Sequence, residues 1–382
     1  MAKLKKVILL LETSREFGRE ILKGISRYAR LHGPWSFYSE ARGLKSAIPR
    51  LTNWNADGII MRNSVISNEL INLNLPAILV LHDPKRPNQL PAVLTDGKTI
   101  AKLASEHLLN RGLKHFAYCG FDNFVWSNER KKYFKEILND AGFHVNVYNQ
   151  PKQRKFKSWE NEQILMRDWL ISLPKPVGIL ACNDDRGQHV LEACKSADIK
   201  VPEEAAVMGV DNDSIICGIC DPPLTSVALN LDAAGYACGE LLDRLMNGKP
   251  MQKQEIMVSA THVVKRQSTD ILSIDDSDVS EAIRFIRLSA KNKIRVNDVV
   301  AQTCLSRRSL ENRFRKIIHR SIQEEIRRTR VELIAQMLIE TDLTVSEITN
   351  LFSFTDAEHI SRYFRKEKGM GLREFRKLNR KC

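Results

Sequence analysis

Residues 345–366 read VSEITNLFSFTDAEHISRYFRK, and this stretch decides how the C-terminal part of the 382-residue chain folds. Val345, Ile348 and Leu351 recur at helical spacing, which predicts an apolar face on a short helix. A turn is expected at residues 353–354, after which the Thr355 hydroxyl is placed to cap the free amides of a second helix. The outward face of that second helix carries Ala357, Glu358, Ser361 and Arg362, which together with Thr355 are candidate contact residues.

The same plan occurs upstream, at residues 297–316, and a long helical stretch over 322–340 joins the two copies. Here the turn is expected at residues 304–305, and Ser306 suits the capping position. Residues expected to point inward are Val296, Val299, Val300, Ala301, Leu310 and Phe314. The outward face of the second helix carries Ser306, Arg307, Arg308, Glu311, Asn312 and Arg315.

Charge gathers on the first of these copies. The chain has a net charge of +13, and residues 306–330 hold nine basic residues against three acidic ones. A single basic helix is usually a solvated face of a helical bundle. Two copies of helix, turn and basic helix favour duplex DNA instead, because Arg pairs with guanine and Asn with adenine in the major groove. If the joining helix is rigid, the two recognition helices should enter adjacent major grooves, roughly 34 Å apart.

The first 270 residues follow a different pattern, in which short apolar runs alternate with amphipathic helical stretches. Runs of this kind suit strands buried on both faces of a parallel sheet, so we expect a doubly wound α/β fold. The runs are VILLL (7–11), ADGIIM (56–61), PAILVL (76–81), HFAYCG (115–120), VGILAC (177–182) and AVMGVD (206–211). They exceed what one five-stranded sheet needs, which predicts two lobes with a ligand cleft between them.

A polar, acidic stretch at residues 267–280 lacks a periodic apolar face and marks the domain boundary. We therefore expect a sensor domain over 1–270, a linker over 271–280 and an all-α domain with two helix-turn-helix motifs over 281–382. The apolar run near the N-terminus is too short for a signal peptide or a membrane span, which predicts a cytoplasmic protein without membrane contact.

Other classes of function find little support in the sequence. The eight cysteines are scattered and suit reduced thiols, and the Cys217/Cys220 pair has no second pair at finger spacing, so no metal is expected. Asp184, Asp185 and Asp211 are conceivable as an acid/base set for glycoside hydrolysis, but no catalytic motif accompanies them. We expect no enzyme and no cofactor.

The C-terminal segment from about Val279 to Arg376 resembles the AraC-family DNA-binding domain. LSRRSLENRFRK (305–316) matches the first recognition helix, and VSEITNLFSFTDAEHISRYFRKEKGMGLREFR (345–376) matches the family signature. Ser353 stands where a glycine is common, and Gly371–Leu372 where Thr-Pro is usual. These departures concern local turn geometry and lie off the predicted groove face.

The N-terminal 270 residues resemble the periplasmic-binding-protein-like sensor of LacI-type regulators. The resemblance rests on residues 93–120, on ILACNDDRGQHVLEACKSADIKVPEEAAVMGVDND (179–213) and on PPLTSV (222–227). A sensor followed by an AraC-type domain is the arrangement of XylR-type xylose-operon regulators. Carried across by this resemblance, the sugar-binding residues are Arg130, Asn183, Asp184 and Asp211, with Phe17, Trp126 and Arg186 as further candidates. Asp185 and Asp213 are expected to cap turns or helix N-termini.

The resemblance implies a regulator, acting as an activator of sugar catabolism genes, that binds an operator in double-stranded DNA. Its effector would be a monosaccharide in the cleft between the lobes, with xylose as the default and other pentoses or hexoses open. A homodimer is implied, with Ala101, Ala104 and Leu108 as contacts or, alternatively, as buried core, and RNA polymerase as a further partner. The competing interpretation is a cytoplasmic sugar-binding protein or enzyme without gene control.

Overall fold

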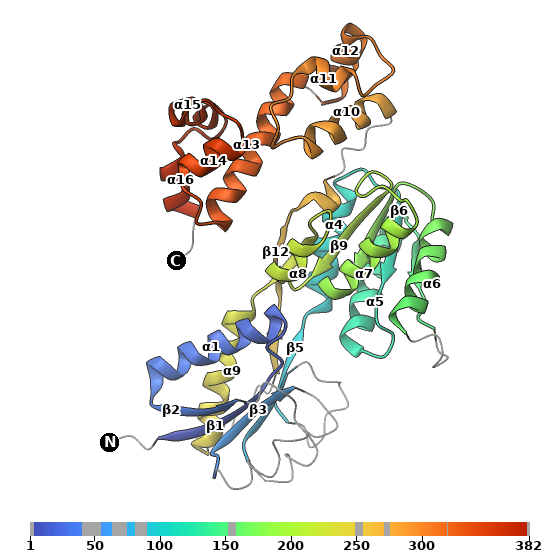
Figure 1. Cartoon of the computed structure of the whole chain (residues 1–382). Coiled ribbons are helices and arrows are strands. Elements are labelled where there is room, and N and C mark those ends of the chain that lie inside the picture. The colour runs from blue at the N-terminus through green and yellow to red at the C-terminus, as the bar shows by residue number, and fades with distance from the viewer. Residues whose placement is uncertain are drawn as a thin grey trace. The chain divides into compact units, whose positions relative to one another are not determined.

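The computed structural model describes residues 4–39, 55–62, 75–80, 90–151, 158–248, 255–270, 276–318 and 320–379. The chain divides into two compact units, Met1–Ile271 and Leu272–Cys382. The first unit is α/β and the second is helical (Figure 1).

The first unit has two lobes, each built on a sheet for which the described residues supply six strands. In the first lobe the strand order is β11 (Glu255–Val258), β5 (Ala92–Thr95), β4 (Ala77–Val80), β3 (Gly58–Arg62), β1 (Lys5–Leu10) and β2 (Trp35–Ser39). In the second it is β12 (Ala260–Val264), β10 (Thr225–Leu229), β9 (Ala205–Val210), β8 (Val177–Ala181), β6 (His115–Cys119) and β7 (Val145–Tyr148). All these neighbours pair in parallel except β10 and β12, which are antiparallel.

Each of the six apolar runs forms a strand, as predicted, because each is buried on both faces. On β6, Phe116 and Tyr118 pack under α4 (Gly97–Leu109) and α5 (Val125–Asp140). Ala117 and Cys119 point to the other face, under α6 (Trp159–Ser172) and α7 (Asp184–Ser196). The alternation of side chains along the strand thus gives both helical layers an apolar surface.

The chain passes between the lobes at three places, at residues 95–97, 229–231 and 258–260. The first crossing leads into α4, where Asp96 Oδ1 accepts hydrogen bonds from the amides of Lys98 and Thr99 at 3.0 and 3.1 Å. The Ala101, Ala104 and Leu108 stripe of α4 is fully buried within the unit. The prediction of this stripe as a dimer contact is therefore wrong, and its alternative as core is correct.

Helix α1 (Glu16–His32) packs closely against α9 (Leu231–Met246) on the first lobe. A Cβ on Gly24 would lie 2.1 Å from the Asp232 carbonyl oxygen, and one on Gly235 would lie 2.2 Å from that of Ile21. Glycine is therefore needed on both helices at their closest approach. This contact holds α1 against α9, and the first turn of α1 lies beside the cavity described below.

The second unit comprises seven helices within the part of the chain that the structure describes: α10 (Ser277–Leu288), α11 (Val296–Val300), α12 (Arg307–Ile318), α13 (Ile322–Glu340), α14 (Val345–Leu351), α15 (Ala357–Lys368) and α16 (Leu372–Asn379). Helices α11–α12 and α14–α15 are the two predicted helix-turn-helix motifs, and α13 joins them (Figure 1). Since α10 begins at Ser277, the last four residues of the expected linker are already helical.

Each motif has its own core. Leu310 and Phe314 are buried in the first and Ile348 in the second, as predicted. Two expected inward residues, Ala301 and Leu351, are exposed instead. The buried stripe of α14 is Ile348, Thr349 and Phe352, the residue just beyond the helix, and Leu351 lies off this stripe.

The cap of α15 also differs from the prediction. Asp356, and not Thr355, accepts the hydrogen bond from the His359 amide, at 2.7 Å to Oδ1. The Thr355 hydroxyl donates to Asp356 Oδ2 at 3.0 Å and so supports the cap. Asp is as good a capping residue as Thr, and the turn geometry selects the later of the two.

Arg330 of α13 bridges the two motifs. Its guanidinium donates to the carbonyl oxygens of Asn292, before the first motif, and Phe352, in the turn of the second, the latter at 2.6 Å. The guanidinium carbon also lies 5.2 Å from the ring centre of Phe354. Because Arg330 is only 6% exposed, these contacts hold both motifs against α13 at a fixed spacing.

Candidate functional site

A cavity of about 140 Å³ lies between the two lobes of the first unit. It lies at the carboxyl ends of the strands, where open α/β sheets bind ligands. The first lobe lines it with Leu11, Glu12, Arg15, Glu16, Phe17, Gly18, Ile21, Arg62 and Val80. The second lobe lines it with Trp126, Arg130, Asn183, Asp184, Asp185, Asp211, Asp213 and Ile216.

Arg130 and Asp211 form the polar centre of the cavity wall. Arg130 is 2% exposed, and its Nη2 lies 3.5 Å from Asp211 Oδ1. Nη1 donates to the Cys182 carbonyl oxygen, and the guanidinium carbon lies 4.9 Å from the ring centre of Trp126. Arg130 Nε and Asp211 Oδ1 are buried and have no hydrogen-bond partner among the described residues. A buried donor and acceptor that make no hydrogen bond in a cavity wall are suited to a hydroxylated ligand, even though the acceptor is in an ion pair with Arg130.

The electrostatics of this pair follow from burial. Burial raises the pKa of Asp211 to about 6, against the opposing effect of the Arg130 charge. Burial, together with the Asp211 charge, also raises the pKa of Asp184. Asp184 is otherwise satisfied, since its oxygens accept the Ser226 hydroxyl at 2.5 Å and the Asp213 amide at 2.7 Å. Asp184 therefore shapes the cavity wall more than it offers free acceptors.

Asn183 caps α7, because its Oδ1 accepts the Arg186 amide at 3.0 Å. Its side-chain nitrogen donates to Asp185 Oδ2 at 3.2 Å, at the edge of the cavity. Phe17 and Trp126 line the cavity from opposite lobes and bring aromatic rings to it. Six of the seven predicted ligand residues are therefore brought together at one cavity.

Arg186 is the exception and does not line the cavity. It is fully buried within the second lobe, where Nη2 donates to Glu162 of α6 at 2.6 Å. Its guanidinium carbon lies 4.8 Å from the ring centre of Phe121 and 5.2 Å from that of Tyr148. The prediction of Arg186 as a ligand residue is corrected accordingly, because its side chain runs to Glu162 of α6 and to the ends of β6 and β7, and not into the cavity.

The sequence-based prediction missed Glu12, Arg15 and Arg62. Glu12 forms an ion pair with Arg62, and Arg15 Nε donates to Asp185 Oδ1 across the cleft at 2.8 Å. A signal for Glu12 and Arg15 exists in the sequence, because they directly follow the first apolar run, at the carboxyl end of its strand.

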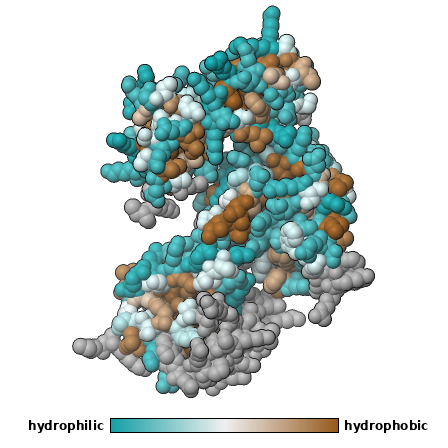
Figure 2. All heavy atoms as spheres, viewed as in Figure 1, coloured by the Kyte–Doolittle hydropathy of each residue, from teal (hydrophilic) through white to brown (hydrophobic). Residues whose placement is uncertain are grey.

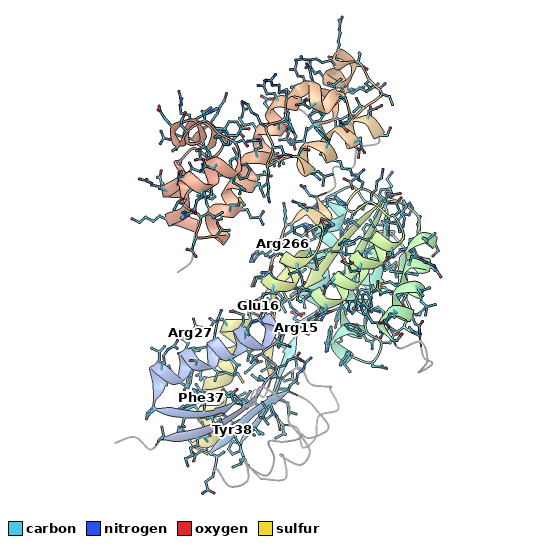
Figure 3. All side chains as sticks on the ribbon, viewed as in Figure 1. Arg15, Glu16, Arg27, Phe37, Tyr38 and Arg266 are labelled. Atoms are coloured by element: carbon cyan, nitrogen blue, oxygen red, sulfur yellow. The ribbon has the colours of Figure 1, made fainter. Side chains whose placement is uncertain are left out.

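The start of α1 also contacts the second lobe. The Glu16 amide donates to Asp213 Oδ2 at 2.7 Å, and Arg19 Nη2 lies 3.2 Å from the same oxygen. Figure 3 shows Arg15 and Glu16 at the end of α1 that faces the second lobe. Asp213 Oδ1 also caps α8 (Ser214–Ile219) by accepting the amides of Ile215 and Ile216, which is the capping role predicted for it.

The second unit carries a groove of about 800 Å³ between its two motifs. Seven of its lining residues are cationic: Lys293, Arg295, Arg307, Arg327, Arg330, Arg362 and Lys366. Thr355 and His359 also line it. A groove with this charge suits a polyanion.

The predicted DNA-contacting side chains lie around this groove and on the outer faces of α12 and α15. Ser306 caps α12, with the Ser309 amide 3.4 Å from its hydroxyl. Arg307 is held by Glu311 at 2.9 Å and by Asn297 at 3.2 Å. Among the described residues, no hydrogen bond or ion pair engages the exposed side chains of Arg308, Asn312, Arg315 and Arg362. On α15, Ala357 and Glu358 are exposed, and the Ser361 hydroxyl donates to the Ala357 carbonyl oxygen.

Comparison with known proteins agrees with both units. A periplasmic binding protein-like domain matches residues 105–269, and a helix-turn-helix domain matches residues 299–378. The sensor alone resembles the catabolite control protein A structure of Lactococcus lactis, with a TM-score of 0.57 and 22% identity over 70% of this chain and 100% of that one. These matches define the class as a transcription regulator with a ligand-binding sensor and a helix-turn-helix DNA-binding domain.

Full-length relatives narrow the class. The xylose operon regulatory protein of Haemophilus influenzae is 30% identical, over 97% of this chain and 98% of the relative. The protein of the same name from Escherichia coli K12 is 28% identical, over 98% and 97%. A solved structure of a xylose-binding transcription activator superposes with a TM-score of 0.84 and 27% identity, covering 100% of both chains.

The chain belongs to the family of xylose operon regulatory proteins. The predicted resemblance, fold class and regulatory function are thereby confirmed. Its relatives regulate transcription, so the enzyme alternative is not retained. Within the described ranges, every helix is too short or too polar to cross a membrane.

Proposed function

We propose that this chain binds xylose in the cavity between its lobes, and that the sugar changes the affinity of the second unit for an operator. The observation that carries the proposal is the buried Arg130–Asp211 pair, whose Nε and Oδ1 have no hydrogen-bond partner among the described residues. The choice of xylose is supported by the relatives, which are named for the xylose operon.

Each cavity residue has a role in this proposal. Arg130 donates to a sugar hydroxyl and the Asp211 carboxylate accepts from the next one, a pairing that vicinal hydroxyls satisfy together. Asn183 supplies an amide at the rim, and Asp184 supports the wall. The rings of Phe17 and Trp126 cover the C–H face of the sugar. Glu12 and Arg62 offer further polar contacts from the first lobe.

A calorimetric titration of the full chain with xylose, arabinose, ribose and glucose tests this assignment. Xylose should bind most tightly, and Arg130→Gln should weaken its binding by at least about tenfold, since a buried charged donor is worth about 1.5–3 kcal/mol. Arg167→Gln is the matched control, because Arg167 pairs on the surface with its neighbour Asp168. If Arg130→Gln and Arg167→Gln bind xylose equally well, the cavity is not the xylose-binding site.

For the second unit we propose that α12 and α15 are the recognition helices. Arg308 and Asn312 read base edges, while Arg315 contacts phosphate. Arg307, Arg362 and the other groove cations apart from the buried Arg330 follow the DNA backbone, together with Ser306, Glu311, Thr355, Ala357, Glu358 and Ser361 at the interface. Exposure, charge and placement on two helix-turn-helix motifs support this assignment. Fluorescence anisotropy with operator and random duplexes, with and without xylose, tests both specificity and control by the sugar.

We further propose that the protein acts in the cytoplasm as a homodimer that activates transcription through RNA polymerase. The name of the structural relative supports activation. For the dimer, Figure 2 shows a hydrophobic cluster over α8, where Ile215 and Ile219 are 60% and 62% exposed. Sedimentation should show Ile219→Asp as a monomer, whereas Leu288→Asp, on the second unit, should sediment like the wild type. A reporter assay in cells with and without xylose tests activation.

A further inference from the structure

Three consecutive residues after β9 face three different parts of the sensor. Asp211 faces Arg130 in the cavity. Asn212 Oδ1 accepts a hydrogen bond from Arg266 Nη2 at 2.8 Å. Asp213 Oδ2 accepts the Glu16 amide of the opposite lobe. The tripeptide 211–213 therefore joins the candidate sugar site, the first lobe and Arg266.

The first two residues of this tripeptide have an unusual backbone conformation. Asp211 has φ of 100° and Asn212 has φ of 54°, in the left-handed region that residues with side chains rarely adopt. Such a conformation persists only where surrounding contacts hold it, and it can change when one of them changes. Here the contacts are Arg266 and Ser226, whose hydroxyl accepts the Asn212 amide at 3.0 Å.

Arg266 stands at the exit of the sensor. It directly precedes the short helix η4 (Gln267–Thr269), and the second unit begins at Leu272. Its Nη1 donates to the Leu224 carbonyl oxygen at 2.9 Å, while Nη2 holds Asn212. The planar guanidinium thus ties both Asn212 and the Leu224 carbonyl to the residue that precedes η4, and Arg266 is labelled in Figure 3.

The exit helix is anchored by a buried hydroxyl network. Ser268 Oγ donates to the Val207 carbonyl oxygen at 2.6 Å and accepts the Thr225 amide at 2.8 Å. Thr269 Oγ1 lies 2.9 Å from Thr225 Oγ1 and 2.8 Å from His107 Nε2. Since Ser268 and Thr269 are fully buried, η4 moves with β9 and β10 and is not a free tether.

We propose that the Asn212–Arg266 hydrogen bond is the output of the sensor, with Arg266 as the positioning residue that couples sugar binding to the DNA-binding unit. This inference rests on the proposed function and names its regulation. Sugar bound at Asp211 and the contact of Asp213 with the first lobe both favour one conformation of the turn at 211–213. Through its hydrogen bond to Asn212, Arg266 makes the position of η4 depend on that conformation. Coupling requires such an element, which both sites bias.

Two variants of the full chain test the proposal. Asn212→Gly keeps the left-handed backbone at no steric cost and removes only the amide that Arg266 holds. Arg266→Gln removes the other partner. Arg167→Gln is again the control, since it removes a surface arginine far in sequence from the turn. For each protein, the operator Kd is measured with and without saturating xylose, and the xylose Kd with and without operator.

We expect the ratio of the two operator Kd values to fall to within about twofold of one in both variants, and to keep the wild-type value in Arg167→Gln. By linkage, the dependence of the xylose Kd on operator should disappear by the same factor. A merely structural role would lower the melting temperature and weaken both affinities while the ratio stays. If both variants keep the wild-type ratio of operator Kd values, this inference is overturned while the proposed function stands. If Arg266→Gln does not fold, the result for Asn212→Gly decides. A wild-type ratio of one overturns the proposed function as well.

Discussion

Asp211→Asn separates sugar recognition from folding stability through the pH dependence of both. The wild-type pKa of this carboxyl is raised from 3.8 to about 6, chiefly by burial. If the sugar needs the carboxylate, the xylose Kd should be about tenfold weaker at pH 5 than at pH 7, because roughly nine in ten molecules are protonated one unit below the pKa. Asp211→Asn should bind xylose weakly and with no such slope.

The same shift has the opposite sign for stability. A carboxyl whose pKa is higher in the folded than in the unfolded state favours folding most at low pH, and this contribution is lost as the pH rises through about 6. At pH 7.5 the ionised Asp211 therefore costs the sugar-free protein up to about 3 kcal/mol, at about 1.4 kcal/mol per pKa unit. Asp211→Asn should unfold at a higher temperature than the wild type at pH 7.5, with the difference shrinking towards pH 5.

Calorimetry between pH 5 and pH 8 measures the xylose Kd, and a thermal melt over the same range measures stability. Other charged groups lie near the Asp211 carboxyl and affect the same pH range: Asp184, Asp185, Arg130 and Arg62. The contribution of Asp211 is therefore obtained by comparing the variant with the wild type, and not from the wild-type pH curve alone. A pH slope that persists in Asp211→Asn, or a lower melting temperature at pH 7.5, would refute the reasoning.

Three further predictions concern the second unit. Arg308→Ala should relax base preference in operator binding, whereas Arg315→Ala should weaken all sequences alike and reduce the salt slope by about one, both measured by anisotropy over a salt series. Ser353→Gly should stabilise the unit by about 1 kcal/mol in a thermal melt, because Ser353 has φ of 53°, while Ser346→Gly within α14 should destabilise it. Arg330→Met should cost about 2–4 kcal/mol by leaving the Asn292 and Phe352 carbonyls unpaired, and should weaken operator binding, whereas Arg328→Met on the exposed face should change stability little.

Periodicity in the sequence was sufficient to predict the architecture. Strands buried on both faces must be continuously apolar, so the six runs identified a doubly wound sensor. The repeated helix, turn and basic helix identified two DNA-reading motifs in the same way. Ser353 departs from the family pattern, in which glycine is common at this position. The structure gives the physical reason for glycine there, because the backbone at Ser353 is left-handed.

The choice among similar side chains depended on packing that no local pattern records. Arg130 and Arg186 both follow apolar strands, yet one lines the cavity and the other is held by Glu162 of α6. The Ala101 stripe has the composition of a dimer contact and is core, because both roles require the same small apolar residues.

The sequence by itself determined the order of the two units, the strands, the motifs and most of the residues at the strand ends, because each depends on neighbours within a few positions. Only the tertiary structure placed Arg15 against Asp185 of the second lobe, buried Arg330 between the motifs and brought Arg266 to Asn212. These contacts join residues 22 to 170 positions apart. Their partners are selected by how sheets and helices pack, and periodicity carries no information about that packing.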